Sequence, residues 1–85
     1  METTQLKKLI REYIAEHVFS GKLPADFTDD TALVSSRLIN SIVVLHMINH
    51  FEELLKISLE AHEVSVDNLD TVNMISAFFV GKINA

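Results

Sequence analysis

The sequence predicts an all-α protein, in which three long helices and one short helix form a bundle with a long ordered loop between the first two. Only two glycines and one proline interrupt its 85 residues, which favours long helices over strands joined by turns. Apolar residues also recur with helical spacing along much of the chain. The hydrophobic content of 48% supplies a core for one domain, residues 1–85.

The first helix is expected over residues 4–19. Its apolar residues follow the i, i+3, i+4, i+7 rule with charged residues between them, as in an amphipathic helix. These apolar residues are Leu6, Leu9, Ile10, Tyr13, Ile14 and Val18. Gly21 and Pro24 follow and end the helix.

Two further long helices are expected nearer the C-terminus. One begins at Asn40-Ser41 and ends near Lys56, and the last begins at Asp70-Thr71, where either residue can act as the N-cap. The inward residues expected in the first of these are Val44, Leu45, Ile48, Phe51 and Leu55, and those in the last are Val72, Ile75, Phe79 and Ile83. The stretch from Val64 to Leu69 predicts one turn of helix. Residues 57–59 could pass for a strand, but a single strand has no partner.

The connection from Ser20 to Asn40 is long for a compact domain, and such loops are usually functional or disordered. Its apolar residues indicate that it packs across the helices. They are Leu23, Phe27, Leu33, Val34, Leu38 and Ile39. An ordered loop that ends at a helix N-terminus is a plausible place for a site.

Composition excludes several classes of function. The chain has no cysteine, so disulfides, thiolate metal sites and a cysteine nucleophile are excluded. The net charge of −5 argues against nucleic acid as a partner and suits a partner with a basic surface. No secretory signal and no membrane-spanning run is present, so a soluble cytoplasmic protein is expected, without a membrane partner.

The segment from Asp29 to Ile42 resembles the acyl and peptidyl carrier protein family. In that family an acidic pair and a leucine precede a motif usually written Asp-Ser-Leu, which opens the second helix. Here the acidic pair is followed by Leu33 and then by Asn40-Ser41-Ile42. The resemblance covers nearly the whole chain, continuing through Leu45, Ile48, Phe51-Glu52-Glu53, Ile57-Ser58-Leu59 and Val66 to Ile75.

The resemblance implies a free-standing, non-catalytic carrier. Ser41 would bear a covalent 4'-phosphopantetheine arm donated by coenzyme A, on which biosynthetic intermediates travel as thioesters. The implied partners are a phosphopantetheinyl transferase, an acyl- or aminoacyl-loading ligase and downstream synthase or transferase enzymes. The carrier is expected to be a monomer. Fatty acyl, polyketide and aminoacyl cargoes all stay open.

Two residues depart from the family pattern. Asn40 replaces the usual aspartate, which removes a carboxylate that basic transferase residues contact, and Arg37 stands where many members have glycine. Ile42 lies in line with the polar residues of its helix and should face solvent. The resemblance implies a docking contact there, and the expected docking surface comprises Asn40, Ile42, Val43 and His46.

Other interpretations compete with the modified serine. Ser41 could simply be an N-cap, and Ser35 and Ser36 are nearby alternatives for modification. An unmodified helical adaptor, a degenerate carrier, is the alternative function. An enzyme lacks support, because no nucleophile–base pair, metal set or phosphate loop is visible. His46 and His50 are spaced i, i+4 but lack a third metal ligand, so two solvent-facing histidines are expected.

Overall fold

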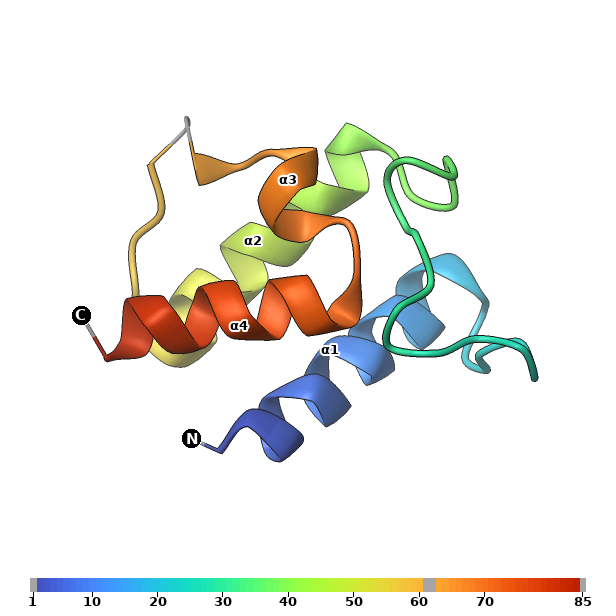
Figure 1. Cartoon of the computed structure of the whole chain (residues 1–85), viewed down its shortest axis with the longest axis horizontal. Helices are drawn as coiled ribbons and strands as arrows, with labels where there is room; N and C mark the ends of the chain where they lie inside the picture. The colour runs from blue at the N-terminus through green and yellow to red at the C-terminus, as the bar shows by residue number, and fades with distance from the viewer. Residues whose placement is uncertain (1, 61–62, 85) are drawn as a thin grey trace.

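The helical spacing of the sequence is realised in the structure, a computed structural model that describes residues 2–60 and 63–84, except the side chains of Val66 and Asp67. The helices are α1 (Thr3–Val18), α2 (Ser41–Leu55), α3 (Val66–Leu69) and α4 (Val72–Ile83) (Figure 1). The described residues contain no strand, so the all-α class is confirmed. The radius of gyration is 11.9 Å, which is typical of a compact globule of this length, about 12 Å.

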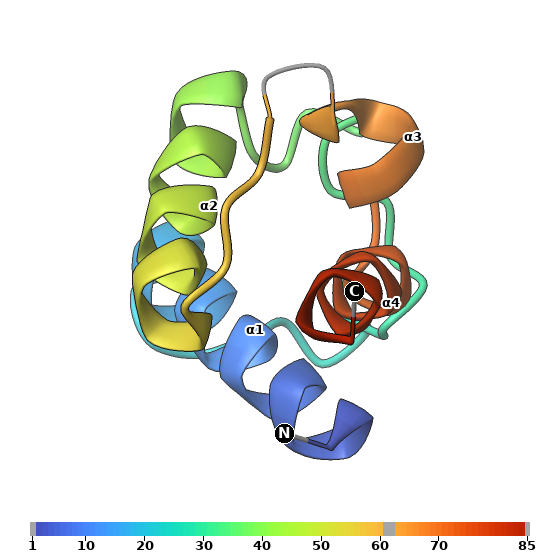
Figure 2. The ribbon, with the colours of Figure 1, turned by 90° about the vertical axis from the view of Figure 1, so that its left-hand side faces the viewer.

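The long helices surround one core. Figure 2 shows α2 on one side of the molecule and α3 with α4 on the other, with α1 across the base. Phe51 of α2 links these elements, because its ring centroid lies 5.3 Å from that of Phe79 in α4 and 6.0 Å from that of Tyr13 in α1. Within the described part of the chain, no helix has the length and apolarity needed to cross a bilayer.

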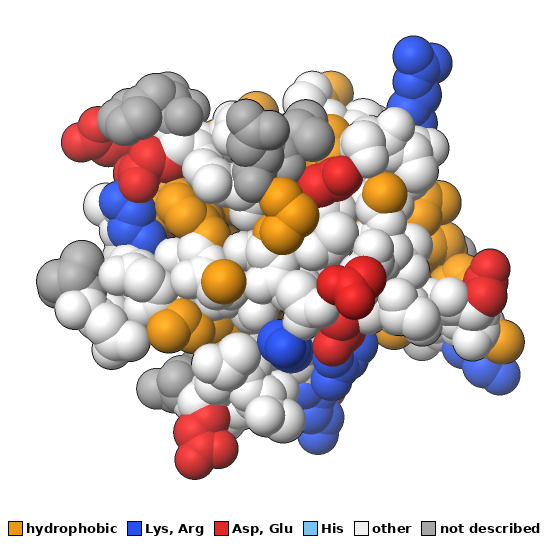
Figure 3. Space-filling view, viewed as in Figure 1, with side chains coloured by type: hydrophobic (Ala, Val, Ile, Leu, Met, Phe, Trp, Pro, Cys, Tyr) orange, Lys and Arg blue, Asp and Glu red, His pale blue; other side chains and the backbone are white. Residues whose placement is uncertain are grey.

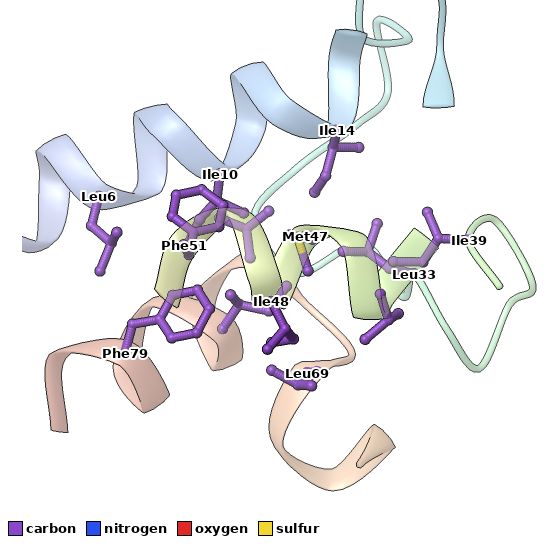
Figure 4. Packing of buried hydrophobic residues seen from close by; sticks show 13 residues of the cluster. Leu6, Ile10, Ile14, Leu33, Ile39, Met47, Ile48, Phe51, Leu69 and Phe79 are labelled. Atoms are coloured by element: carbon purple, nitrogen blue, oxygen red, sulfur yellow. The ribbon is translucent and has the colours of Figure 1, made fainter. Parts of the chain in front are cut away.

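Among the residues that the structure describes, thirteen buried hydrophobic residues form the core, and they come from all four helices and from the loop before α2 (Figure 4). They are Leu6, Ile10, Ile14, Leu33, Ile39, Val44, Met47, Ile48, Phe51, Leu69, Val72, Ile75 and Phe79. Burial of such side chains stabilises the fold by about 1.5–3 kcal/mol each relative to exposure. Of the apolar residues predicted for the first helix, the structure buries Leu6, Ile10 and Ile14 in α1.

The predicted inward stripe of α2 was wrong at one position. Leu45 is 51% exposed, whereas Met47, which was not predicted, is buried. The residues of a helix that share a face are spaced by three or four, so Met47 continues the arc of Val44 and Phe51. Leu45 lies about 100° further round the helix from Val44, at the edge of the buried arc.

The segment from Ser20 to Asn40 contributes to the core but does not bury every apolar residue. Leu33 and Ile39 are buried, and Leu23, Phe27 and Val34 are partly buried against the core. Leu38 was expected to pack inward and is instead 40% exposed. Leu38 follows Arg37, whose backbone is left-handed (φ 66°) and turns the chain at this point. After this turn Ile39, and not Leu38, is buried in the core.

Candidate functional site

The N-terminus of α2 is capped by Asn40, not by Ser41. Asn40 has an extended backbone, and its Oδ1 accepts a hydrogen bond from the Val43 N–H at 2.9 Å. The Asn40 carbonyl accepts from the Val44 N–H at 3.1 Å. Ser41 is therefore the first residue inside the helix, and it is exposed. Among the described residues, its hydroxyl has no hydrogen-bond partner, so capping does not occupy it.

The two competing serines differ from Ser41 in this respect. The Ser35 hydroxyl donates to Oδ2 of Asp70 at 2.7 Å. The Ser36 hydroxyl donates to the backbone carbonyl of Ala32. A hydroxyl that is already donating must give up that bond to react, whereas the Ser41 hydroxyl need not. The structure therefore distinguishes the three serines by whether the hydroxyl already donates a hydrogen bond. The sequence distinguished them only by their position relative to the start of the helix.

An apolar cavity of about 360 Å³ lies beside Ser41. Three segments wall it: the loop before α2, the first turns of α2, and the segment that leads into and through α3. The lining residues are Val34, Ser41, Val44, Leu45, Val64, Ser65 and Leu69. Nothing in the sequence connects residues 64–69 with Ser41, because only the fold brings the two segments together.

The predicted docking residues occupy different environments. Asn40 and His46 are exposed, and Ile42 is 61% exposed, as its place on the helix predicted. Val43 is half-buried and packs against the core, so it contributes less free surface than expected. Leu45, which had been assigned to the interior, is exposed and lines the cavity beside Ser41. Leu38 is also exposed, but it lines a different pocket, with Phe19, Pro24 and Phe27.

The loop before Ser41 is held in place by Asp70, at the junction of α3 and α4. Oδ1 of Asp70 accepts hydrogen bonds from the N–H groups of Val34 (2.9 Å) and Ser35 (2.8 Å). The Asp70 carbonyl accepts from the Leu33 N–H at 2.7 Å. In the sequence Asp70 is a candidate cap for the last helix, but Thr71 caps α4 by accepting from the Met74 N–H at 3.0 Å. Asp70 instead fixes the wall of the cavity that Val34 forms.

A second set of contacts fastens the same loop. Two oxygens of Asp29 lie 2.8 and 2.9 Å from Nη1 of Arg11 in α1. The Asp29 carbonyl accepts from the Asn73 N–H at 3.1 Å, and the Asn73 side-chain amide donates to Asp30 at 2.6 Å. The acidic pair of the sequence thus has a structural role: it joins the loop to α1 and to the start of α4.

Removal of the Asp70 carboxylate is expected to destabilise the protein. The backbone N–H of Ser35 and then the Ser35 hydroxyl, by donating to the ionised carboxylate, lower the pKa of Asp70 below its usual value, although partial burial opposes this. Hydrogen bonds to charged groups contribute about 1.5–3 kcal/mol each when shielded, and exposure reduces this. Asp70→Ala should therefore lower the free energy of unfolding by about 2 kcal/mol in total at pH 7.

The pH dependence of the stability difference between wild type and Asp70→Ala follows from the lowered pKa of Asp70. A carboxyl group whose pKa is lower in the folded state stabilises the fold above its unfolded pKa, about 3.9, and the stabilisation is lost as the pH falls through the folded pKa. Urea unfolding at a series of pH values should show wild type and Asp70→Ala converging below about pH 4. Asp26→Ala, at an exposed aspartate of the same loop, is the control. A constant difference down to the lowest pH would contradict this account.

Variants of Asn40 should separate capping from recognition. Asn40→Ala is expected to lower the free energy of unfolding by about 1 kcal/mol, because the Val43 N–H loses its acceptor. Asn40→Asp should preserve the cap, add a charge that the helix dipole favours, and speed modification of Ser41 by a broadly specific phosphopantetheinyl transferase. Mass spectrometry over time gives the rate, with Asn49→Asp, an exposed position further along α2, as the charge control. Equal rates for Asn40→Asp and wild type would show that the missing carboxylate does not limit recognition.

The histidines of α2 face outward. His46 and His50 are both exposed, and the His50 ring lies against Tyr13, with centroids 5.1 Å apart. His17 of α1 lies on the same tyrosine at 4.2 Å. Within residues 2–60 and 63–84, no group of three or more metal-ligating side chains could hold an ion. The fourth histidine of the sequence, His62, lies outside the described residues.

Comparison with known proteins adds no assignment. No protein-family model matches the chain, and no curated protein matches it. The carrier interpretation of Asn40-Ser41-Ile42 therefore stays a prediction, and its support comes from the geometry around Ser41.

Proposed function

We propose that this protein is an acyl carrier protein of the four-helix carrier type, with a long ordered loop between the first two helices. It tethers biosynthetic intermediates as thioesters on a 4'-phosphopantetheine arm attached to Ser41 and delivers them to partner enzymes. The chain itself performs no catalysis. The partners are a phosphopantetheinyl transferase, a loading ligase and downstream synthase or transferase enzymes, and the carrier acts as a monomer in the cytoplasm.

One observation carries the proposal: an exposed, uncommitted serine hydroxyl begins α2 at the edge of an apolar cavity. A capping serine would have its oxygen turned to the backbone, but Asn40 takes that role here. The N-terminal end of a helix carries a partial positive charge, which favours the phosphodiester that modification creates. Both features support a modified serine over a purely structural one.

Coenzyme A is the one co-substrate that the attachment reaction needs. The Ser41 Oγ forms a bond to the pantetheine-bearing phosphorus, the pyrophosphate bond of coenzyme A breaks, and adenosine 3',5'-bisphosphate leaves. The transferase takes the hydroxyl proton, since the described residues offer Ser41 no side-chain acceptor. When bound, the arm supplies the terminal thiol for acyl attachment, which matters because the chain has no cysteine. Tethering raises the effective concentration of the cargo at each partner.

The cavity favours an apolar acyl cargo over an aminoacyl one. Of the seven described residues that line it, five are aliphatic, and the other two are Ser41 and Ser65. Transfer of an ammonium group into such a space would be strongly unfavourable, because none of the described lining side chains carries a negative charge to offset its desolvation. A hydrocarbon chain would instead gain about 25 cal/mol for each Å² removed from water. Aliphatic acyl groups are therefore the proposed cargo.

An unmodified adaptor is the alternative, and one observation favours it. The exposed apolar residues Leu38, Ile42 and Leu45 could contact a partner without any arm. Incubation with coenzyme A and a broadly specific transferase, followed by intact-mass analysis, separates the two functions. A carrier gains the mass of one phosphopantetheine, whereas an unmodified adaptor keeps its mass under conditions in which a known carrier is fully converted.

A further inference from the structure

One wall of the apolar cavity is a short turn between two buried residues. Leu33 and Ile39 are buried in the core, whereas Val34 is half-buried and residues 35–38 are exposed. We call residues 34–38 the flap. Its first residue, Val34, lines the cavity. The two ends of the flap are therefore anchored in the core, while most of the residues between them lie at the surface.

The carboxylate of Asp70 fastens the flap to a distant part of the chain. Its Oδ1 accepts hydrogen bonds from the N–H groups of Val34 and Ser35, and its Oδ2 accepts from the Ser35 hydroxyl. Among the described residues, the other hydrogen bonds of the flap are local and reach no further than the carbonyl of Ala32. Asp70 directly follows Leu69, which also lines the cavity. The carboxylate therefore ties one wall of the cavity to another.

The other walls of the cavity are held more firmly. Val44 of α2 and Leu69 of α3 line the cavity and belong to the buried core. The segment that leads into α3 is joined to α4 by an ion pair, with Nζ of Lys82 2.5 Å from an oxygen of Glu63. Movement of either helical wall would expose a core side chain, whereas movement of the flap exposes no fully buried one. The flap is therefore the wall that opens at the lowest cost.

We infer that Asp70 is a positioning residue for the cargo: its carboxylate latches the flap, and this latch decides whether the cavity holds or releases an acyl chain. The inference rests on the proposed function, because the chain concerned is the one carried at Ser41. While the three hydrogen bonds are made, Val34 stays against the hydrocarbon. When they break, this side of the cavity opens between the anchored residues Leu33 and Ile39.

A latch of this kind suits a carrier, which has to shelter its cargo in transit and present it at each partner enzyme. The latch lies where α3 and the loop before α2 meet (Figure 1). Figure 3 shows the face that carries α3 and α4, where acidic, basic and hydrophobic side chains are interspersed. The two hydrogen bonds that Ser35 donates to Asp70 lie at exposed positions. Water can replace exposed hydrogen bonds at modest cost, so the flap can open and close repeatedly.

A single introduced cysteine tests the latch without a transferase or an arm. The chain has no cysteine, so Ser41→Cys supplies one thiol at the cavity, and a methyl or an octyl thiosulfonate converts it to an alkyl disulfide. The rate at which a water-soluble phosphine reduces this disulfide reports whether the alkyl chain is sheltered. The octyl disulfide should be reduced about tenfold more slowly than the methyl disulfide, because burial of its methylenes favours the closed cavity. Asn49→Cys, at an exposed position of α2, is the matched control and should show little difference between the two labels.

Variants of Asp70 then test the latch itself. Asp70→Ala should reduce the protection of the octyl disulfide about fivefold, the loss expected when exposed hydrogen bonds to a charged group are removed. Asp70→Asn keeps one acceptor oxygen for the N–H groups of Val34 and Ser35, so it should retain most of the protection. Asp29→Ala removes the ion pair with Arg11 and loosens the same loop outside the flap, so it should retain the protection in full.

Three results would overturn the inference. Equal reduction rates of the two labels in Ser41→Cys would show that the cavity holds no chain. Undiminished protection after Asp70→Ala would show that the carboxylate does not latch the flap, and equal losses in Asp29→Ala and Asp70→Ala would assign the effect to general loss of stability. Failure of phosphopantetheine attachment to the wild-type protein would overturn the proposed function instead, because the disulfide experiment uses neither coenzyme A nor a transferase.

Discussion

Replacement of Ser41 by alanine is expected to abolish the attachment of phosphopantetheine while leaving the fold intact. The hydroxyl is the proposed nucleophile, so its removal eliminates the reaction. The helix keeps its cap, because Asn40 accepts from the Val43 N–H and the Ser41 hydroxyl makes no hydrogen bond among the described residues. Alanine is also the best helix former. Intact-mass analysis after incubation with coenzyme A and transferase should show complete loss of the mass gain, with an unchanged circular dichroism spectrum.

Ser35→Ala and Ser36→Ala are the matched controls for this experiment. Both variants should be modified as completely as wild type, because their hydroxyls are already engaged with Asp70 and with the Ala32 carbonyl. Ser35→Ala should lower stability slightly through the lost bond to Asp70. Mass gain that persists in Ser41→Ala and disappears in either control would show that a loop serine is the acceptor.

Ile48→Ala is expected to cause the largest loss of stability considered for this protein. Ile48 is 3% exposed and lies in the centre of the α2 face that meets the core (Figure 4). Truncation of a buried isoleucine costs about 2–5 kcal/mol, through lost burial and the cavity that remains. A domain of this size has about 5–10 kcal/mol of net stability, so the variant should unfold at much lower urea concentration. Chemical denaturation followed by circular dichroism measures the difference.

Ile42→Ala is the control for Ile48→Ala, because it removes the same atoms from the same helix. Ile42 is 61% exposed, so its free energy of unfolding should change by less than about 0.5 kcal/mol. Under the proposed function, Ile42→Ala should instead slow loading by a partner enzyme, while Ile48→Ala should affect loading only through unfolding. Similar destabilisation by both variants would contradict the orientation of α2.

The sequence by itself determined the fold class and the approximate position of each helix. Helical spacing placed α1, the start of α2 and the start of α4 to within about two residues, the usual uncertainty of helix ends. The same spacing placed Ile42 on the solvent side and Ile48 and Phe51 on the core side. These features follow from local periodicity and from the few glycines and the single proline of the chain, so they require no knowledge of what each helix contacts.

Tertiary structure decided which residues at the edge of each face are buried. Leu45 was expected inside and Met47 was not singled out, yet the structure reverses them, and Leu38 of the loop is exposed as well. A helical wheel locates the centre of an apolar face, but the width and exact direction of the buried arc depend on the neighbouring helices. For α2 those neighbours are α1 and α4, which meet it through Phe51.

Tertiary structure also decided the surroundings of the candidate serine. Asn40 and Ser41 are both favourable caps, and only the backbone conformation at Asn40 assigns the role and leaves Ser41 uncommitted. The cavity and the Asp70 contacts join residues about 35 positions apart in the sequence, since Ser35 is bound by Asp70. Such contacts carry no periodic signal. They arise because the short α3 and the loop before α2 meet across the core, and their polar backbone groups require partners there.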